Sequence, residues 1–220
     1  LTPEMRTALG TEVTKATPDE LIRIILRAPV ELLWNGGIGT YVKSVGETND
    51  MVGDRTNNAL RINGSELRAK IVGEGGNLGF TQRGRIEYAR KGGRINTDAI
   101  DNSGGVDCSD HEVNIKIAFG SALAAKRITL KQRDSILKKM TDNVGELVLR
   151  DNHLQTQAIS IAQLQGTALL EPASQLMLTL EEKGFLNREV EALPDSKQLA
   201  ELRSTKQGLS RSEERRVGKE

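Results

Sequence analysis

The sequence of 220 residues has a single cysteine, few aromatic residues and no excess of either charge. Cys108 has no second cysteine for a disulfide, so a reducing compartment, the cytoplasm, is the expected location. Basic residues number 31 against 30 acidic ones, so charge does not mark a nucleic-acid-binding protein. No apolar run approaches the roughly 20 residues that cross a bilayer. We therefore expect neither nucleic acid nor a membrane as a partner.

Both ends of the sequence look cut. The first residue, Leu1, is not a start methionine. The last ten residues, 211–220, lack apolar periodicity and resemble the translation of a common sequencing adapter, so we interpret them as a non-native tail. A natural charged tail is the alternative. Without its four basic and three acidic residues the rest is neutral, with 27 of each sign (31 − 4 and 30 − 3).

Glycine is concentrated in the first half of the chain, where 15 of the 22 glycines lie between Asn35 and Gly105. The following residues, to about Arg203, are poor in glycine and have helical periodicity. Such a change in composition indicates a boundary between a loop-rich α/β part and an all-helical part. We predict an α/β domain over residues 1–125 and the start of a helical C-terminal domain over residues 126–210.

Short apolar runs that end in glycine-rich turns indicate parallel strands. Three such runs, Val30–Trp34, Lys70–Val72 and Arg94–Asn96, precede clusters of glycine and polar residues. This pattern predicts βα units of a doubly wound, Rossmann-like parallel sheet. Predicted helices begin with one capped by Thr17 and stopped before Pro29. The others span about 81–90, 107 onward, 129–150, 154–165, 172–183 and 195–203.

The glycine clusters are the candidate binding loops, because ligands of open α/β sheets lie at the carboxyl ends of the strands. Glycine lets backbone amides approach a ligand, and the carboxamides of Asn77 and Asn102 both donate and accept hydrogen bonds. The alternative is that the glycines serve turns and bulges. Gly73 and Gly75 begin a G-x-G-x-x-G pattern, but Leu78 stands where the third glycine belongs. The main pyrophosphate-binding turn is therefore absent from this sequence.

The polar residues from Asp107 to Glu112 open the helix that we predict to begin near Asp107. Ser109 then lies in the first turn, where it either caps the helix or binds a carboxylate, and the residues alone favour capping. Asp107 and His111 have a spacing that a metal site would allow, but acidic residues that open a helix are common, so we predict no metal. Cys108 is interpreted as a small packed residue rather than a nucleophile.

Several long motifs resemble one family. They are Trp34–Lys43, Val72–Gly79, the stretch from Gly92 to Asn114, and Leu149–Gln157. Together they resemble the large, bacterial-type NAD-specific glutamate dehydrogenases over about residues 1–210. The resemblance implies a cofactor domain of the Rossmann type, NAD as cofactor, and the oxidative deamination of L-glutamate to 2-oxoglutarate and ammonium. It also implies a homo-oligomeric full-length enzyme.

The same resemblance implies roles for eight residues. Those expected to line the cofactor cleft are Gly36, Gly37, Gly75, Gly76, Asn77 and Asn102. Those expected at the substrate are Gly104 and Ser109, with Ser109 near the distal carboxylate, so that the resemblance favours ligand binding over capping. The sequence departs from the family pattern at Asp110 and His111, which replace an aromatic pair.

The resemblance also implies what this sequence lacks. The catalytic lysine and aspartate of the family, and its first glycine-rich turn, would lie upstream of Leu1. We therefore expect the second half of a cofactor domain joined to the start of a helical domain, without catalytic activity of its own. The competing interpretation is a non-catalytic α/β module that binds a nucleotide or a partner protein and shares only the scaffold.

Overall fold

The structure is a computed structural model that describes residues 1–217, so the last three residues of the predicted tail, 218–220, lie outside the described residues. Contacts divide the chain into two compact units. The first comprises Leu1–Asp98 with the segment from Ile159 onward, and the second is Ala99–Ala158. This division differs from the boundary predicted at residue 125, and the functional domains stay a prediction. Within residues 1–217, no helix is both long and apolar enough to cross a membrane.

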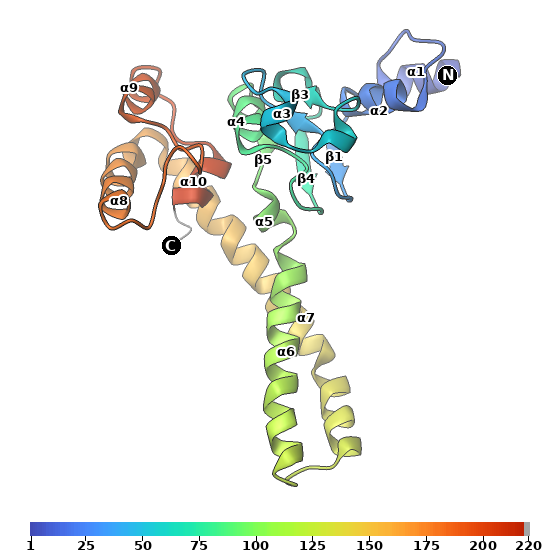
Figure 1. Cartoon of the computed structure of the whole chain (residues 1–220), viewed down its shortest axis with the longest axis vertical. Coiled ribbons are helices and arrows are strands. Elements are labelled where there is room, and N and C mark those ends of the chain that lie inside the picture. The colour runs from blue at the N-terminus through green and yellow to red at the C-terminus, as the bar shows by residue number, and fades with distance from the viewer. Residues whose placement is uncertain (218–220) are drawn as a thin grey trace. The chain divides into compact units, whose positions relative to one another are not determined.

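The first unit contains a three-stranded parallel sheet in the order β1-β4-β5 (Figure 1). Its strands are β1 (Leu32–Asn35), β4 (Ile71–Glu74) and β5 (Arg94–Ile95). Leu32 pairs with Ile71 and Ile71 pairs with Arg94, so the three strands begin together, and β5 ends two residues before β1 and β4. All three predicted strands are confirmed: the first two are shifted by one or two residues, and the third begins at the predicted Arg94 and ends one residue earlier. The predicted α/β class is correct, whereas a doubly wound sheet is not established by three strands.

A second, two-stranded parallel sheet was not predicted. It pairs β2 (Val42–Lys43) with β3 (Ile62–Asn63). The glycine loop after β1 therefore leads into another strand rather than a helix. Short helices precede and connect these strands: α1 (Pro3–Leu9), α2 (Pro18–Leu26), α3 (Asn49–Val52) and the 3-10 turns Arg55–Asn57 and Gly64–Glu66.

The helix α4 (Gln82–Arg90) covers one face of the three-stranded sheet. Thr81 caps its first turn by accepting a hydrogen bond from the backbone N–H of Gly84. The core between helix and strands consists of Val42, Ile62, Leu67, Val72, Phe80, Tyr88 and Ile95. Side chains alternate between the faces of a strand, so the odd-numbered residues of β4 lie on the opposite face. On that opposite face Leu32 and Ile71 are exposed.

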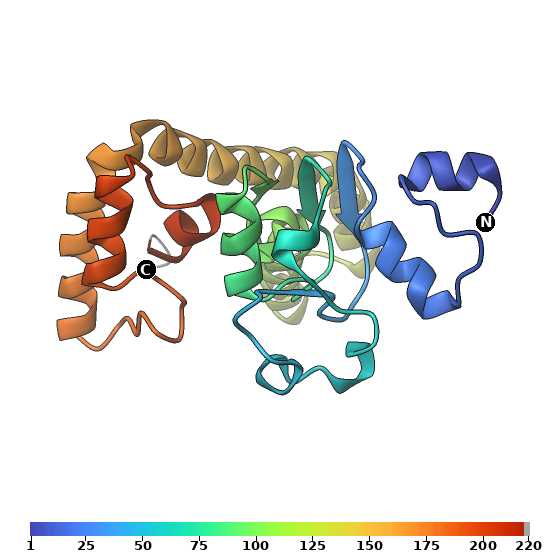
Figure 2. The same ribbon diagram turned by 90° about the horizontal axis from the view of Figure 1, so that it is seen from above.

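The C-terminal helices of the first unit form a separate core. They are α8 (Leu170–Glu182), α9 (Ser196–Ser204) and α10 (Arg211–Val217), and a 3-10 turn at Gly166–Leu169 precedes them. α8 packs beside α9, and α10 contacts both α4 and α8 (Figure 2). The buried residues here are Leu170, Ala173, Met177, Leu193, Leu199, Leu202, Leu209 and Val217. The foreign origin of residues 211–220 stays a prediction.

The second unit is a helical hairpin (Figure 1). It contains most of the short α5 (Asp98–Asp101), all of α6 (Ser103–Ala124) and most of α7 (Leu130–Gln165). Two predictions are wrong here. α6 begins four residues before Asp107, and α7 is one continuous helix although a break was expected between residues 150 and 154. No proline or glycine lies in that interval, so nothing in it stops a helix.

Candidate functional site

The loops that follow β1 and β4 meet at the carboxyl edge of the sheet. The loop Asn35–Thr40 follows β1 and the loop Gly75–Phe80 follows β4. The backbone N–H of Gly76 donates to the carbonyl oxygen of Asn35 at 3.0 Å, and that of Tyr41 donates to the carbonyl of Gly79 at 2.8 Å. Parallel pairing thus brings together four of the predicted cofactor residues: Gly36, Gly37, Gly75 and Gly76.

The glycines of these loops have different surroundings. A β-carbon built on Gly76 would lie 2.0 Å from the carbonyl oxygen of Gly37, so glycine there permits the two loops to touch. Gly37 is exposed and a β-carbon on it would meet nothing within 4 Å, while its backbone N–H donates to the side-chain oxygen of Asn35 at 3.4 Å. Gly37 therefore fits the expectation that these glycines leave room for a ligand near the backbone. Gly76 instead permits the close contact between the two loops.

A buried charge network holds the loop after β4. Glu74, the last residue of β4, is fully buried and forms a bidentate ion pair with Arg85 of α4, with N–O distances of 2.6 and 2.9 Å. Arg85 also lies 3.4 Å from a carboxylate oxygen of Asp98. Each carboxylate accepts a backbone N–H of the loop, Glu74 from Phe80 at 3.2 Å and Asp98 from Leu78 at 2.8 Å. The network therefore fixes the second half of the loop at two points.

Sequence reasoning missed Arg85 and Asp98. Arginine and aspartate are common on helix surfaces, and the burial of Arg85, which is 1% exposed, depends on the packing of α4 against β4. One local signal existed. Arg85 and Tyr88 are three residues apart on the predicted helix and therefore share a face, and Tyr88 belongs to the core.

The loop after β1 is anchored at its end by a second set of polar contacts. The backbone N–H of Thr40 donates to a carboxylate oxygen of Asp54 at 2.8 Å, and the buried Arg61 donates to the carbonyl of Thr40 at 2.8 Å. The hydrogen bond from Thr40, followed by one from the Asn57 side chain, holds the pKa of Asp54 below its ordinary value. These contacts restrain the loop at Thr40, three residues after Gly37.

The remaining predicted site residues belong to the second unit. Asn102 directly precedes α6, Gly104 lies in its first turn, and Ser109 is exposed in its second turn. The capping role considered for Ser109 is wrong, because the helix begins at Ser103 and the N–H groups near Ser109 lie inside it. How Asn102 and Ser109 relate to the glycine loops of the first unit stays a prediction.

The start of α6 is held by a residue of α7. The Asn152 side chain donates to the carbonyl of Ile100 and to the hydroxyl of Ser103, both at 2.9 Å, on either side of Asn102 in the chain. Asn152 lies in the motif Leu149–Gln157, but its type and position gave no indication of this contact. These two hydrogen bonds thus restrain the backbone on both sides of Asn102, a predicted ligand residue.

Two predictions about the first turns of α6 have a structural outcome. Cys108 is exposed, so its interpretation as a packed residue is wrong. The Nε2 atom of His111 lies 3.7 Å from a carboxylate oxygen of Asp151 on α7. Within residues 1–217, no group of three or more His, Cys, Asp or Glu side chains is placed to hold a metal ion.

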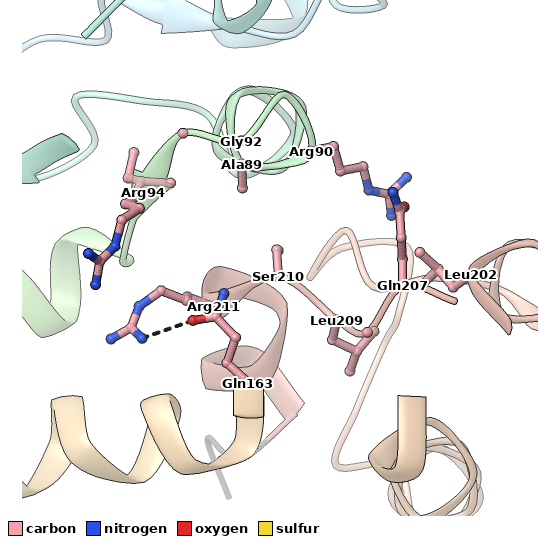
Figure 3. Close-up of a pocket in the computed structure, with 13 residues that line it drawn as sticks. Ala89, Arg90, Gly92, Arg94, Gln163, Leu202, Gln207, Leu209, Ser210 and Arg211 are labelled. Carbon is pink, nitrogen blue, oxygen red and sulfur yellow. Dashed lines mark hydrogen bonds between the residues drawn. The ribbon is translucent and has the colours of Figure 1, made fainter. Parts of the chain in front are cut away.

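A cavity of about 280 Å³ lies elsewhere in the first unit (Figure 3). It is bounded by the end of α4, the beginning of β5 and residues 207–211. Arg211 donates to the side-chain oxygen of Gln163 at its margin. None of the predicted cofactor or substrate residues lines this cavity. It lies at the amino end of β5, opposite the end where the glycine loops meet, and we do not assign it to the cofactor.

Comparison with known proteins supplies a family. Residues 1–162 match the family model described as the catalytic domain of bacterial NAD-glutamate dehydrogenase. The chain is 54% identical over 213 residues to an NAD-specific glutamate dehydrogenase of Pseudomonas aeruginosa, covering 97% of this chain and 13% of that protein. A protein of the same name from Halomonas elongata is 51% identical over 210 residues, covering 96% and 13%. One from Mycobacterium tuberculosis is 46% identical over 220 residues, covering 97% and 14%.

Proposed function

This chain belongs to the family of bacterial NAD-glutamate dehydrogenases, and we propose that it supplies one wall of that enzyme's NAD crevice. It spans about 13% of the length of the curated relatives it matches. The reaction proposed for the whole protein converts L-glutamate, water and NAD⁺ into 2-oxoglutarate, ammonium, NADH and a proton. The observation that carries the proposal is the meeting of the loops Asn35–Thr40 and Gly75–Phe80 at the carboxyl edge of a parallel sheet.

The sheet topology supports a crevice with a second wall. Among the described strands of this sheet, β1 pairs only with β4, so β1 forms an edge whose other side is open. In a doubly wound sheet the ligand binds at the carboxyl ends of the two neighbouring strands where the strand order reverses. In a complete sheet of this kind β1 would be one of these two inner strands. The proposed Rossmann-like fold would therefore add the missing half, with the first glycine-rich turn, on the open side of β1.

The residues present have distinct proposed roles. The exposed main chain at Gly37, with Gly36 beside it, would contact the nucleotide, while Gly75 and Gly76 keep the second loop close enough to share the crevice wall. The carboxamides of Asn77 and Asn102 would bind ribose or carboxamide groups. Gly104 and Ser109 would face the substrate, with the Ser109 hydroxyl donating to its distal carboxylate.

NAD, when bound, supplies the acceptor for the hydride that leaves the α-carbon of glutamate. The residues of this chain would hold and orient that acceptor and exclude water around it. They include none of the proposed proton-transfer groups, a lysine and an aspartate that the resemblance places upstream of Leu1. We therefore propose that this chain alone binds the cofactor weakly and does not turn over glutamate.

The experiment is a pair of measurements on the 220-residue chain. Calorimetry should detect NAD⁺ and NADH binding, and an absorbance assay should detect no NADH formation from glutamate and NAD⁺. Turnover by this chain would contradict the assignment of the catalytic groups to another segment. Absence of any NAD⁺ or NADH binding would favour the alternative, a module that uses the scaffold to bind a partner protein. Homo-oligomerisation and a cytoplasmic location of the whole enzyme are further proposals that this pair does not address.

A further inference from the structure

The indole of Trp34, the one tryptophan of the sequence, packs directly on the backbone of two glycines. It is the third residue of β1, and its indole lies across β4. A β-carbon built on Gly73 would lie 2.6 Å from its Cε3 atom, and one on Gly75 would lie 2.4 Å from its Cζ2 atom. Any side chain at either position would displace the ring. These two glycines thus permit one side of the indole to lie directly on the strand.

The other side of the indole is open to solvent. Trp34 is 58% exposed, although its neighbour Leu33 packs against the core under α4. Alternation along β1 therefore places Trp34 on the face that α4 does not cover. Leaving much of an indole in water is unfavourable, by about 25 cal/mol per Å² of apolar surface. Tryptophan is enriched at binding interfaces relative to the rest of the protein surface.

The position of Trp34 relates this open ring to the proposed crevice. It precedes Asn35–Thr40, the loop with exposed main chain at Gly37, and it touches Gly75, the first residue of the other loop. The exposed apolar residues Ile38 and Leu78, 87% and 63% exposed, stand in the same two loops. The carboxyl edge therefore presents an aromatic ring and two apolar side chains close to exposed main chain.

We propose that Trp34 is a stacking platform for a planar heteroaromatic ring of the bound nucleotide. This inference rests on the proposed function and adds the group that the site recognises. One side of the indole packs on main chain and the other is exposed, and an exposed aromatic ring is a surface on which nucleobases stack. The packing already restricts rotation of the side chain, so binding loses less conformational entropy. Adenine and nicotinamide share this chemistry, and the experiment separates them.

The first test is tryptophan fluorescence of the 220-residue chain, with NAD⁺, AMP and nicotinamide mononucleotide as separate ligands. NAD⁺ does not absorb where tryptophan emits, so saturable quenching reports a change at the indole rather than energy transfer to the ligand. N-Acetyltryptophanamide, titrated in parallel, corrects for collisional quenching. Saturable quenching by NAD⁺ is expected, and whichever of AMP and the mononucleotide reproduces it identifies the stacked ring.

The second test is calorimetry of NAD⁺ binding to variants. Base stacking on an aromatic residue is worth about 1–3 kcal/mol, so Trp34→Leu should raise the Kd roughly 5- to 150-fold. Trp34→Phe, which keeps an aromatic ring and the fit to Gly73, should recover most of the affinity. Leu32→Ala is the matched control, since Leu32 lies exposed on the same strand face, and it should leave the Kd unchanged. Circular dichroism of each variant verifies the fold.

The outcomes separate the two proposals. NAD⁺ binding with unquenched Trp34 fluorescence, or an equal Kd for Trp34→Leu and the unsubstituted chain, would overturn the stacking platform while leaving the proposed function intact. Absence of NAD⁺ binding to the unsubstituted chain would overturn both.

Discussion

Replacing Arg85 by methionine should strongly destabilise the first unit, because Glu74 and Asp98 would lose the cation between them. Glu74 is fully buried, and the variant removes the two hydrogen bonds that the Arg85 guanidinium donates to its carboxylate. Removing one partner of a buried ion pair costs about 3–5 kcal/mol. For a chain of this length such a loss lowers the midpoint of thermal unfolding by roughly 6–20 °C. Urea unfolding followed by circular dichroism measures the free energy directly.

The matched control for this variant is Arg83→Met. Arg83 is exposed on the same helix, and its replacement should change the free energy of unfolding by no more than about 0.5 kcal/mol. Adding Glu74→Gln to Arg85→Met should recover part of the loss, since a neutral amide no longer needs the cation. A loss below about 1 kcal/mol for Arg85→Met would refute the claim that this network holds the loop after β4.

Three further predictions concern the other contacts of the site. Gly75→Val should weaken NAD⁺ binding by displacing Trp34 from the glycine backbone, and calorimetry showing an unchanged Kd would contradict this. The pKa of Asp54 is lowered in the folded state, so its contribution to stability is present above its ordinary pKa and is lost as pH falls below about 4. Asp54→Asn should therefore remove that part of the pH dependence of the free energy of unfolding. An unaltered pH profile would speak against it. Asn152→Ala should cost about 1–3 kcal/mol and lower hydrogen-exchange protection at the start of α6, whereas unchanged protection would show that its two hydrogen bonds are dispensable.

Helices with strong local signals were predictable from the sequence. Thr17, Pro18 and Glu20 predicted the start of α2, and the structure has the reciprocal capping box there, with Glu20 accepting from the backbone N–H of Thr17 at 2.8 Å. α9 likewise lies within one residue of the helix predicted over 195–203, and Asp195 caps it. In both cases the residues that determine the helix end lie within four positions of each other, so no tertiary contact was needed.

Elements that depend on distant contacts were not predictable in the same way. The two glycines at 104 and 105 indicated a loop, yet they form the first turn of α6, whose start is held by Asn152 almost 50 residues later. The strands β2 and β3 have two residues each, too few to show a period. Their pairing depends on the loop that carries Asp54 and Arg61 between them.

In the candidate site, too, features with local sequence signals were predictable and features that depend on distant contacts were not. The loops were predictable because glycine clusters follow apolar runs, and parallel pairing then brings them together. The packing of the Trp34 indole on Gly73 and Gly75 was not predictable, since it depends on which residue of β1 lies opposite Gly73. The Glu74–Arg85–Asp98 network was missed because charged residues are assigned to the surface unless their partners are known.

The most direct test of the proposed crevice wall is amide chemical-shift mapping of the 220-residue chain during titration with NAD⁺. The account predicts saturable shifts concentrated at the backbone amides of Gly36, Gly37 and Asn77, together with the indole N–H of Trp34. Saturable shifts confined to the cavity beside β5, at Gly92 to Ile95, or no saturable shifts at all, would contradict it.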